Sequence, residues 1–158
     1  MKGQVERFKR ILENNNYMVL ATSSDNVPWS TPVFFVFDKD YNFYWYSRKQ
    51  TRHSQNISRN SNISAVIFGV GNSDEGFGVY LEGKAREVEE NELESALNLY
   101  AKRAAKSEEE KIQLTTKQDF LGDSDFRVYK ITSSKIYVSN SSTMWQGKYI
   151  DSKSEINF

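Results

Sequence analysis

The sequence predicts an α+β fold in which an antiparallel sheet is flanked by short helices. Short runs of aromatic and β-branched residues alternate with polar turns, a pattern typical of strands joined by hairpins. Other segments carry apolar residues at helical spacing. The 158 residues suit one domain with a substantial core. We therefore expect a single domain over residues 1–153, followed by a loose tail at 154–158.

The first part of the chain predicts one helix and two strands. Four apolar residues recur at helical spacing and indicate a short amphipathic helix: Val5, Phe8, Ile11 and Leu12. Residues 17–22 are apolar on both alternating faces, which indicates a strand buried on both sides. After a turn at 23–26, Pro28 opens the next strand. Pro32 lies inside that strand, and because proline has no N–H to donate, it indicates an interruption, an edge or a ligand-facing position.

The middle of the chain predicts a hairpin followed by a short helix and another strand. Aromatic runs at 31–37 and 42–47 flank the turn residues 38–40. A short polar, helix-like segment follows at 54–60, and the next apolar run is 63–68.

The glycine-rich stretch 69–76 could be a phosphate-binding loop or a hairpin loop. It contains neither G-x-x-x-x-G-K-[ST] nor G-x-G-x-x-G, so we favour the hairpin loop. The alternating run 77–88 then predicts a long strand.

The clearest predicted helix is 89–105, which begins with acidic residues and ends with basic ones, in accord with the helix dipole. Ser107 and Glu110 have the spacing of a capping box and indicate a further short helix. Two final strands are expected near 126–132 and 135–139.

Composition excludes several kinds of chemistry. The 21 basic residues balance the 21 acidic ones, so bulk charge does not indicate a nucleic-acid partner. The absence of Cys removes disulfides, thiolate metal sites and thiol nucleophiles, and one His cannot make a His-based metal cluster. We expect no metal site. No apolar signal core or membrane-length segment is visible, so we expect a cytoplasmic protein with no membrane partner.

Charge is nevertheless separated locally. Residues 41–73 contain no Asp or Glu, but they include four cations: Arg48, Lys49, Arg52 and Arg59. A strand here delivers hydroxyl and cationic side chains to the start of a helix, which suits an anion such as a phosphate. The acid-rich stretch 74–125 could instead hold a catalytic carboxylate pair, but its acids follow helix starts and solvated faces.

The ordered set Ser47-x-x-x-Thr51-Arg52-His53, preceded by an aromatic strand and an Asp-containing turn, resembles the pyridoxamine 5'-phosphate oxidase-like family. Members of that family usually have Thr, then Ser four residues on, then Arg-Lys, so His53 stands in place of Lys. The resemblance implies an antiparallel split β-barrel of six to seven strands, a homodimer and FMN bound at the subunit interface. It also implies an FMN-dependent oxidoreductase that acts on a small-molecule substrate or electron donor.

The resemblance assigns cofactor contacts as follows: Thr31, Pro32, Val33 and Phe34 to the flavin ring, Ser47, Arg48, Thr51, Arg52 and His53 to the phosphate, and Trp145 to a flavin covered from the partner subunit. Many members have Arg where Thr31 stands. Arg48 could point away from the phosphate, because successive strand residues face opposite sides. Trp145 has a simple packing role as its alternative. Arg52 is the permanently charged phosphate ligand, and we expect Arg52 and His53 to lie outside the apolar core.

Catalytic residues and the substrate are not identified by the sequence. Vitamin B6 oxidases carry a C-terminal Arg and His pair for the substrate phosphate, whereas this chain has only Arg127 and no His after Phe126. The alternative function is a non-catalytic flavin- or haem-binding module. Nucleic-acid binding by the cationic segment beside Tyr44, Trp45 and Tyr46 is disfavoured, because these aromatics alternate between strand faces.

Overall fold

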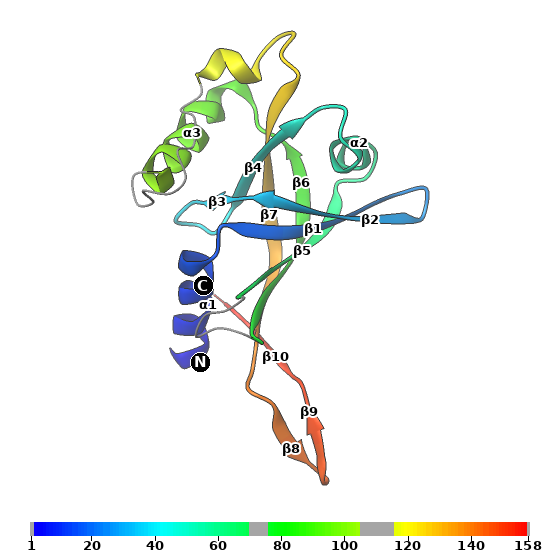
Figure 1. Ribbon diagram of the computed structural model, residues 1–158, viewed down its shortest axis with the longest axis vertical. Helices are drawn as coiled ribbons and strands as arrows, with labels where there is room; N and C mark the ends of the chain where they lie inside the picture. Colours follow the sequence, from blue (N-terminus) through cyan, green and yellow to red (C-terminus); the bar gives the residue numbers. More distant parts are fainter. Residues whose placement is uncertain (1, 70–75, 105–115, 158) are drawn as a thin grey trace.

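Figure 1 shows the computed structural model of the protein, which describes residues 2–69, 76–104 and 116–157. In chain order its elements are α1 (Lys2–Asn14), β1 (Tyr17–Ser24), β2 (Val27–Phe34), β3 (Val36–Phe37), β4 (Phe43–Arg48), α2 (Arg52–Arg59), β5 (Asn62–Phe68), β6 (Gly78–Glu87), α3 (Glu90–Ala104), the 3-10 helix η1 (Lys117–Phe120), β7 (Phe126–Ser139), β8 (Thr143–Trp145), β9 (Lys148–Ile150) and β10 (Lys153–Glu155).

The main sheet is antiparallel and runs in the order β2-β1-β5-β6-β7-β4-β3, with the short β10 beside β7. It curls into a half-barrel, with α1, α2 and α3 around it (Figure 1). The predicted α+β class and antiparallel split barrel are therefore confirmed. Strands β8 and β9 form a separate hairpin that projects away from the sheet.

Strand β1 is buried on one face only, so the expectation of burial on both faces was wrong. Met18, Leu20 and Thr22 face the core, whereas Tyr17 and Ala21 are exposed on the other face. We call the face that carries Tyr17 and Ala21 the outer face of the sheet. It is apolar in sequence, but among the described residues no helix of this chain packs over β1 on that side.

Strand β2 lies at the edge of the sheet, which is one of the alternatives that Pro32 indicated. It pairs with β1 alone, and Pro32 stands opposite Val19 in the register. The turn before it contains Asp25 and Asn26 with φ of 54° and 61°, left-handed values that Asp and Asn tolerate better than most residues.

Strand β7 is one long strand, so the predicted pair of strands at 126–132 and 135–139 was wrong. Opposite β7, Glu82 pairs with Lys135 and Gly83 with Ser133, which leaves Ser134 as the extra residue of a β-bulge. A Cβ atom at Gly83 would collide with the carbonyl oxygen of Thr132, so only glycine allows this close approach. The serines that resemble a turn in sequence therefore bend a continuous strand.

The C-terminal residues are also paired with the sheet, where the sequence predicted a loose tail. Strand β10 pairs with β7, and the N–H of Ile156 donates to the carbonyl oxygen of Ile136 at 2.8 Å. Ile156 is buried in the main core. Among the other expectations, the helix at 89–105 is confirmed as α3, while the helix at Ser107 and most of the loop at 69–76 lie outside the described residues.

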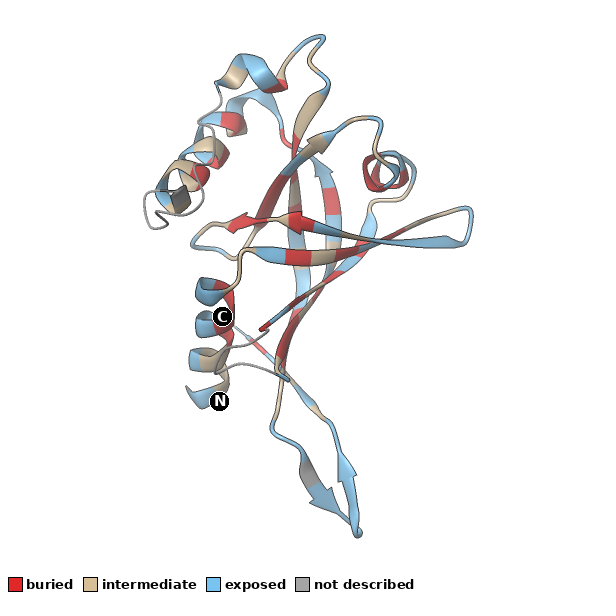
Figure 2. Cartoon of the chain, in the orientation of Figure 1, coloured by how far each residue is buried: buried red, intermediate tan, exposed pale blue. Residues whose placement is uncertain are grey.

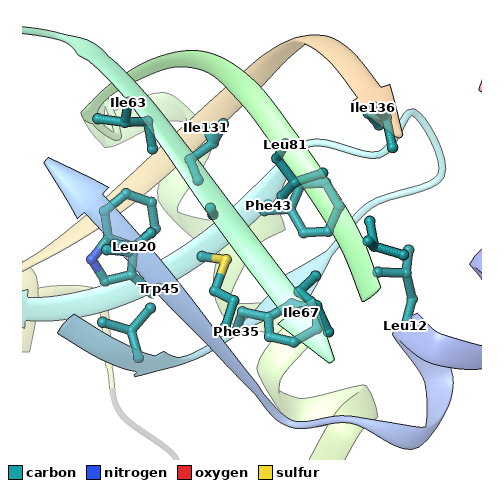
Figure 3. Close-up of a cluster of buried hydrophobic side chains, with 14 of the residues drawn as sticks. Leu12, Leu20, Phe35, Phe43, Trp45, Ile63, Ile67, Leu81, Ile131 and Ile136 are labelled. Carbon is teal, nitrogen blue, oxygen red and sulfur yellow. The ribbon is translucent and has the colours of Figure 1, made fainter. Parts of the chain in front are cut away.

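The core is divided into two apolar clusters. The larger fills the inside of the curled sheet beneath α1 and includes the labelled side chains of Figure 3. The smaller lies between α3, η1 and the far side of β4 and β7, where Tyr100 donates its hydroxyl to the carbonyl oxygen of Tyr44 at 3.2 Å. In the described part of the chain, no helix is both long and apolar enough to cross a membrane.

Candidate functional site

A polar knot forms where β4 ends and α2 begins. We define the knot as Ser47, Thr51, Arg52 and His53. Ser47 is on the core-facing side of β4, Thr51 is the N-cap of α2, and Arg52 and His53 open the helix. The N–H of Thr51 donates to the carbonyl oxygen of Arg48 at 3.1 Å and so closes the connecting turn. Residues separated by six positions in sequence are thereby brought together at one helix N-terminus.

His53 is the centre of the knot. Its Nε2 lies 2.8 Å from the Ser47 hydroxyl oxygen and 3.2 Å from that of Thr51. Only 5% of His53 is exposed, so the expectation that it lies outside the core was wrong. Burial lowers the pKa of His53 below its ordinary value of 6.5, so the imidazole is neutral at pH 7. It can therefore offer a hydrogen bond to an anion, but not a full positive charge.

Thr51 is the N-cap residue of α2, but its side chain does not cap the helix. Its backbone is extended, and its side chain makes no capping hydrogen bond to the helix. The hydroxyl oxygen instead lies 2.9 Å from both the carbonyl oxygen of Arg48 and the hydroxyl of Ser54. First-turn N–H groups have no partner within their own helix, so an uncapped N-terminus is suited to an anion.

Arg52 supplies the exposed cation of the knot. Its guanidinium carbon lies 4.5 Å from the ring centroid of Trp29 on β2, and among the described residues no carboxylate pairs with it. Arg48 is directed elsewhere: it faces the opposite side of β4, 3.8 Å from Asp125 and stacked over Phe126. The structure therefore brings Ser47, Thr51, Arg52 and His53 together but leaves Arg48 outside the knot.

The predicted flavin contacts lie along the edge strand β2. Thr31 and Val33 stand opposite Leu20 and Met18 on the core side, while Pro32 and Phe34 are on the other side. The Thr31 hydroxyl oxygen is buried and has no hydrogen-bond partner. The same is true of Trp45 Nε1 on β4, a strand in contact with β2, and of Ser133 Oγ at the bulge of β7. Unpaired buried polar atoms are costly, so the Thr31 hydroxyl on the edge strand β2 is a candidate ligand contact.

Trp145 is remote from the knot of its own chain. It lies on the β8–β9 hairpin and is 60% exposed. Figure 2 shows that this hairpin is almost entirely exposed where it projects from the sheet. The structure thus separates Trp145 from the other predicted cofactor residues within one chain.

Two contributors to the site were missed in the sequence. Ser54 is 3% exposed and completes the hydroxyl cluster, and Trp29 supports Arg52. Helical spacing offered no signal for Ser54, since Ile57 is the one apolar residue of α2 and defines no apolar face by itself. The sequence did contain a sign of the Trp29 contact. Trp29 follows Pro28 on a predicted edge strand, where an aromatic side chain can contact a neighbouring element.

The curled antiparallel sheet, with its polar knot beside a free edge strand, defines a split β-barrel protein. The family model of pyridoxamine 5'-phosphate oxidase matches residues 5–140 of the chain. The protein therefore belongs to this family. The comparison with curated protein sequences gave no match.

Several solved structures have the same fold. A putative pyridoxamine 5'-phosphate oxidase from Listeria innocua has a TM-score of 0.62 at 20% identity, over 86% of this chain and 98% of that one. A FAD-binding protein from Mesorhizobium loti has a TM-score of 0.60 at 15% identity, over 85% of this chain and 91% of that one. A haem-binding protein from Mycobacterium smegmatis has a TM-score of 0.65 at 19% identity and covers 93% of this chain, which spans only 56% of that protein. At these identities the likeness shows the fold alone.

Proposed function

We propose that the protein binds FMN and acts as an FMN-dependent oxidoreductase on a small molecule. The observation that carries the proposal is the knot, in which two hydroxyls, a buried imidazole and an exposed guanidinium meet at the uncapped start of α2. Family membership and the likeness to a FAD-binding protein support a flavin at this place. When bound, FMN would supply the electron chemistry, and the protein would bind and orient it.

The residues present fit a flavin phosphate. The hydroxyls of Ser47 and Thr51 are both within hydrogen-bond distance of His53 Nε2, so one anion could contact all three side chains. Arg52 would add the permanent charge and can bind two oxygens at once. The unpaired hydroxyl of Thr31 and the free edge of β2 would then face the ring.

The proposed cofactor site carries little positive charge. Thr31 contributes a hydroxyl and no charge, His53 is neutral through burial, and Arg48 is engaged with Asp125 on the other side of β4. Arg52 is therefore the residue that would distinguish a phosphorylated flavin from an unphosphorylated one. This assignment makes the proposal open to a direct binding test.

Vitamin B6 phosphates are poor candidates for the substrate. Arg127 is the one Arg after Phe126, and its guanidinium already binds Glu87 at 2.7 Å and the carbonyl oxygens of Gly122 and Ser124. A side chain held in this way is not available to a substrate phosphate. We therefore expect little oxidation of pyridoxamine phosphate, well below the rate of roughly 1 per second that ordinary enzymes reach.

We further propose that the protein acts as a homodimer through the outer face. A groove of about 600 Å³ crosses that face over β1, β5, β6 and β7, and its lining includes Val19, Ala21, Val66, Tyr80 and Tyr137. The β8–β9 hairpin exposes four more large apolar side chains: Met144, Trp145, Tyr149 and Ile150. A second copy would cover both surfaces and would bring Trp145 to the flavin of its partner.

The test of the function is the spectrum of the purified protein and its response to reductant. Flavin absorption that is bleached by NADH or NADPH and restored by an acceptor would support an oxidoreductase. Flavin absorption without turnover would indicate a binding module. A Soret band in place of flavin absorption would favour the second candidate, a haem-binding module, for which the likeness to the mycobacterial haem-binding protein is the supporting observation.

A further inference from the structure

Trp29 lies beneath the one exposed cation of the knot. The Arg52 guanidinium carbon is 4.5 Å from the centroid of the Trp29 ring, within the range of a cation–π contact. Trp29 is 40% exposed, so its ring lies outside the core and is available to the Arg52 side chain. An arginine on a helix surface normally samples many rotamers, and this contact restricts them.

The backbone of Trp29 is fixed to the same helix. Asn56 on α2 donates from Nδ2 to the hydroxyl oxygen of Thr22 at 3.1 Å, and the Thr22 hydroxyl donates to the carbonyl oxygen of Trp29 at 3.4 Å. Asn56 and Thr22 are both buried. Further along, Asn60 donates to the Ser23 hydroxyl at 3.2 Å. The β1–β2 hairpin and α2 are thus held together, and the backbone of Trp29 keeps a set position relative to α2.

We propose that Trp29 is a positioning residue that holds the Arg52 guanidinium at the start of α2, ready for the phosphate of the cofactor. This inference rests on the proposed flavin function. A long side chain that is already ordered loses less freedom when the anion binds, so the contact strengthens phosphate recognition without touching the phosphate. Trp29 would act on the charged part of the ligand and leave the ring unaffected.

The test is a double-mutant cycle read out with two ligands. The dissociation constants of FMN and riboflavin are measured for wild type, Trp29→Ala, Arg52→Ala and the double variant. The ratio of the two constants measures how much the phosphate contributes to binding. We expect Trp29→Ala to reduce the preference for FMN roughly two- to fivefold, the range of an exposed cation–π contact. In the Arg52→Ala background the same change should have no further effect on the ratio.

Two further variants separate positioning from a structural role. Trp29→Phe keeps an aromatic face and should retain most of the FMN preference that Trp29→Ala loses. If Trp29 only supported packing, the two variants would not differ in their preference for FMN over riboflavin. Arg59→Ala, at the other end of α2 and paired with Asp25, is the matched control and should leave the ratio unchanged. Circular dichroism checks that each variant is folded.

The outcomes are distinct. Equal losses of FMN and riboflavin in Trp29→Ala would overturn the inference, since Trp29 would then contact the ring or support the fold. A Trp29→Ala effect of the same size with and without Arg52 would also overturn it. If wild type binds FMN no better than riboflavin, the proposed phosphate site itself fails, which is a different result from a failure of Trp29 alone.

Discussion

The two faces of the sheet have similar apolar composition but different surroundings. On the inner face Met18 and Leu20 are fully buried among residues of the same chain, and on the outer face their neighbour Tyr17 is 56% exposed. The knot belongs to the inner side, where α2 packs on the β1–β2 hairpin. The difference shows that the chain fills the inner side of the sheet by itself, whereas on the outer face α3 and η1 cover the far side of β4 and β7 and Tyr17 on β1 stays exposed.

The largest expected effect is the loss of stability when a side chain on the inner face is shortened. Leu20→Ala removes a fully buried side chain and should lower the free energy of unfolding by about 2–5 kcal/mol, because the cavity cannot fully collapse. Tyr17→Ala on the outer face should cost about 1 kcal/mol or less. Urea unfolding of both variants measures the contrast. Similar losses for the two would mean that both faces are packed within one chain.

The next effect concerns association. Val66→Glu places a charge in the outer groove and should raise the dissociation constant of the dimer at least about a hundredfold, since a buried unpaired charge is strongly unfavourable. Gln118→Glu adds the same charge on the exposed part of η1 and serves as the control. Light scattering at micromolar concentration checks both. A wild-type monomer, or a Val66→Glu dimer, would remove the outer face as the interface.

A smaller effect is the pH dependence that His53 gives to the apo protein. The pKa of His53 is lowered in the folded state, so the unfolded chain binds the proton more readily. The stability from neutral His53 is present above the unfolded pKa of about 6.5, and it is lost as pH falls toward the lower folded pKa. His53→Gln keeps a polar group and cannot titrate. The unfolding free energies of wild type and His53→Gln should therefore converge, or cross, as pH falls from 8 to 5; a constant difference would contradict a buried neutral imidazole.

Much of the fold could be predicted because local chemistry determined it. Pro32 indicated an edge strand among its alternatives, and Asp25 and Asn26 indicated a turn, where the structure has left-handed backbone. The errors occurred where a distant strand decides the outcome. Ser133 and Ser134 have the composition of a turn, but Gly83 on the neighbouring strand allows a bulge, and polar residues after Lys153 pair with β7.

The site could be predicted in part for the same reason. The order of Ser47, Thr51, Arg52 and His53 along the chain located the knot, since a strand that leads into a helix brings them together. The burial of His53 could not be predicted, because it depends on the packing of α2 against Thr22 through Asn56. The position of Trp29 after Pro28 on a predicted edge strand suggested an exposed aromatic residue, but not its contact with Arg52, which joins β2 to α2.

The central claim is that the knot binds the FMN phosphate through Arg52, and the most direct measurement is a titration of FMN and riboflavin against wild type and Arg52→Ala. A hydrogen bond to a charged partner contributes roughly 1.5–3 kcal/mol, so Arg52→Ala should weaken FMN binding about tenfold to a hundredfold. Riboflavin lacks the phosphate, and its weaker affinity should barely change. Equal losses for the two ligands would show that Arg52 does not read the phosphate, and no loss for either would place the flavin site away from the knot.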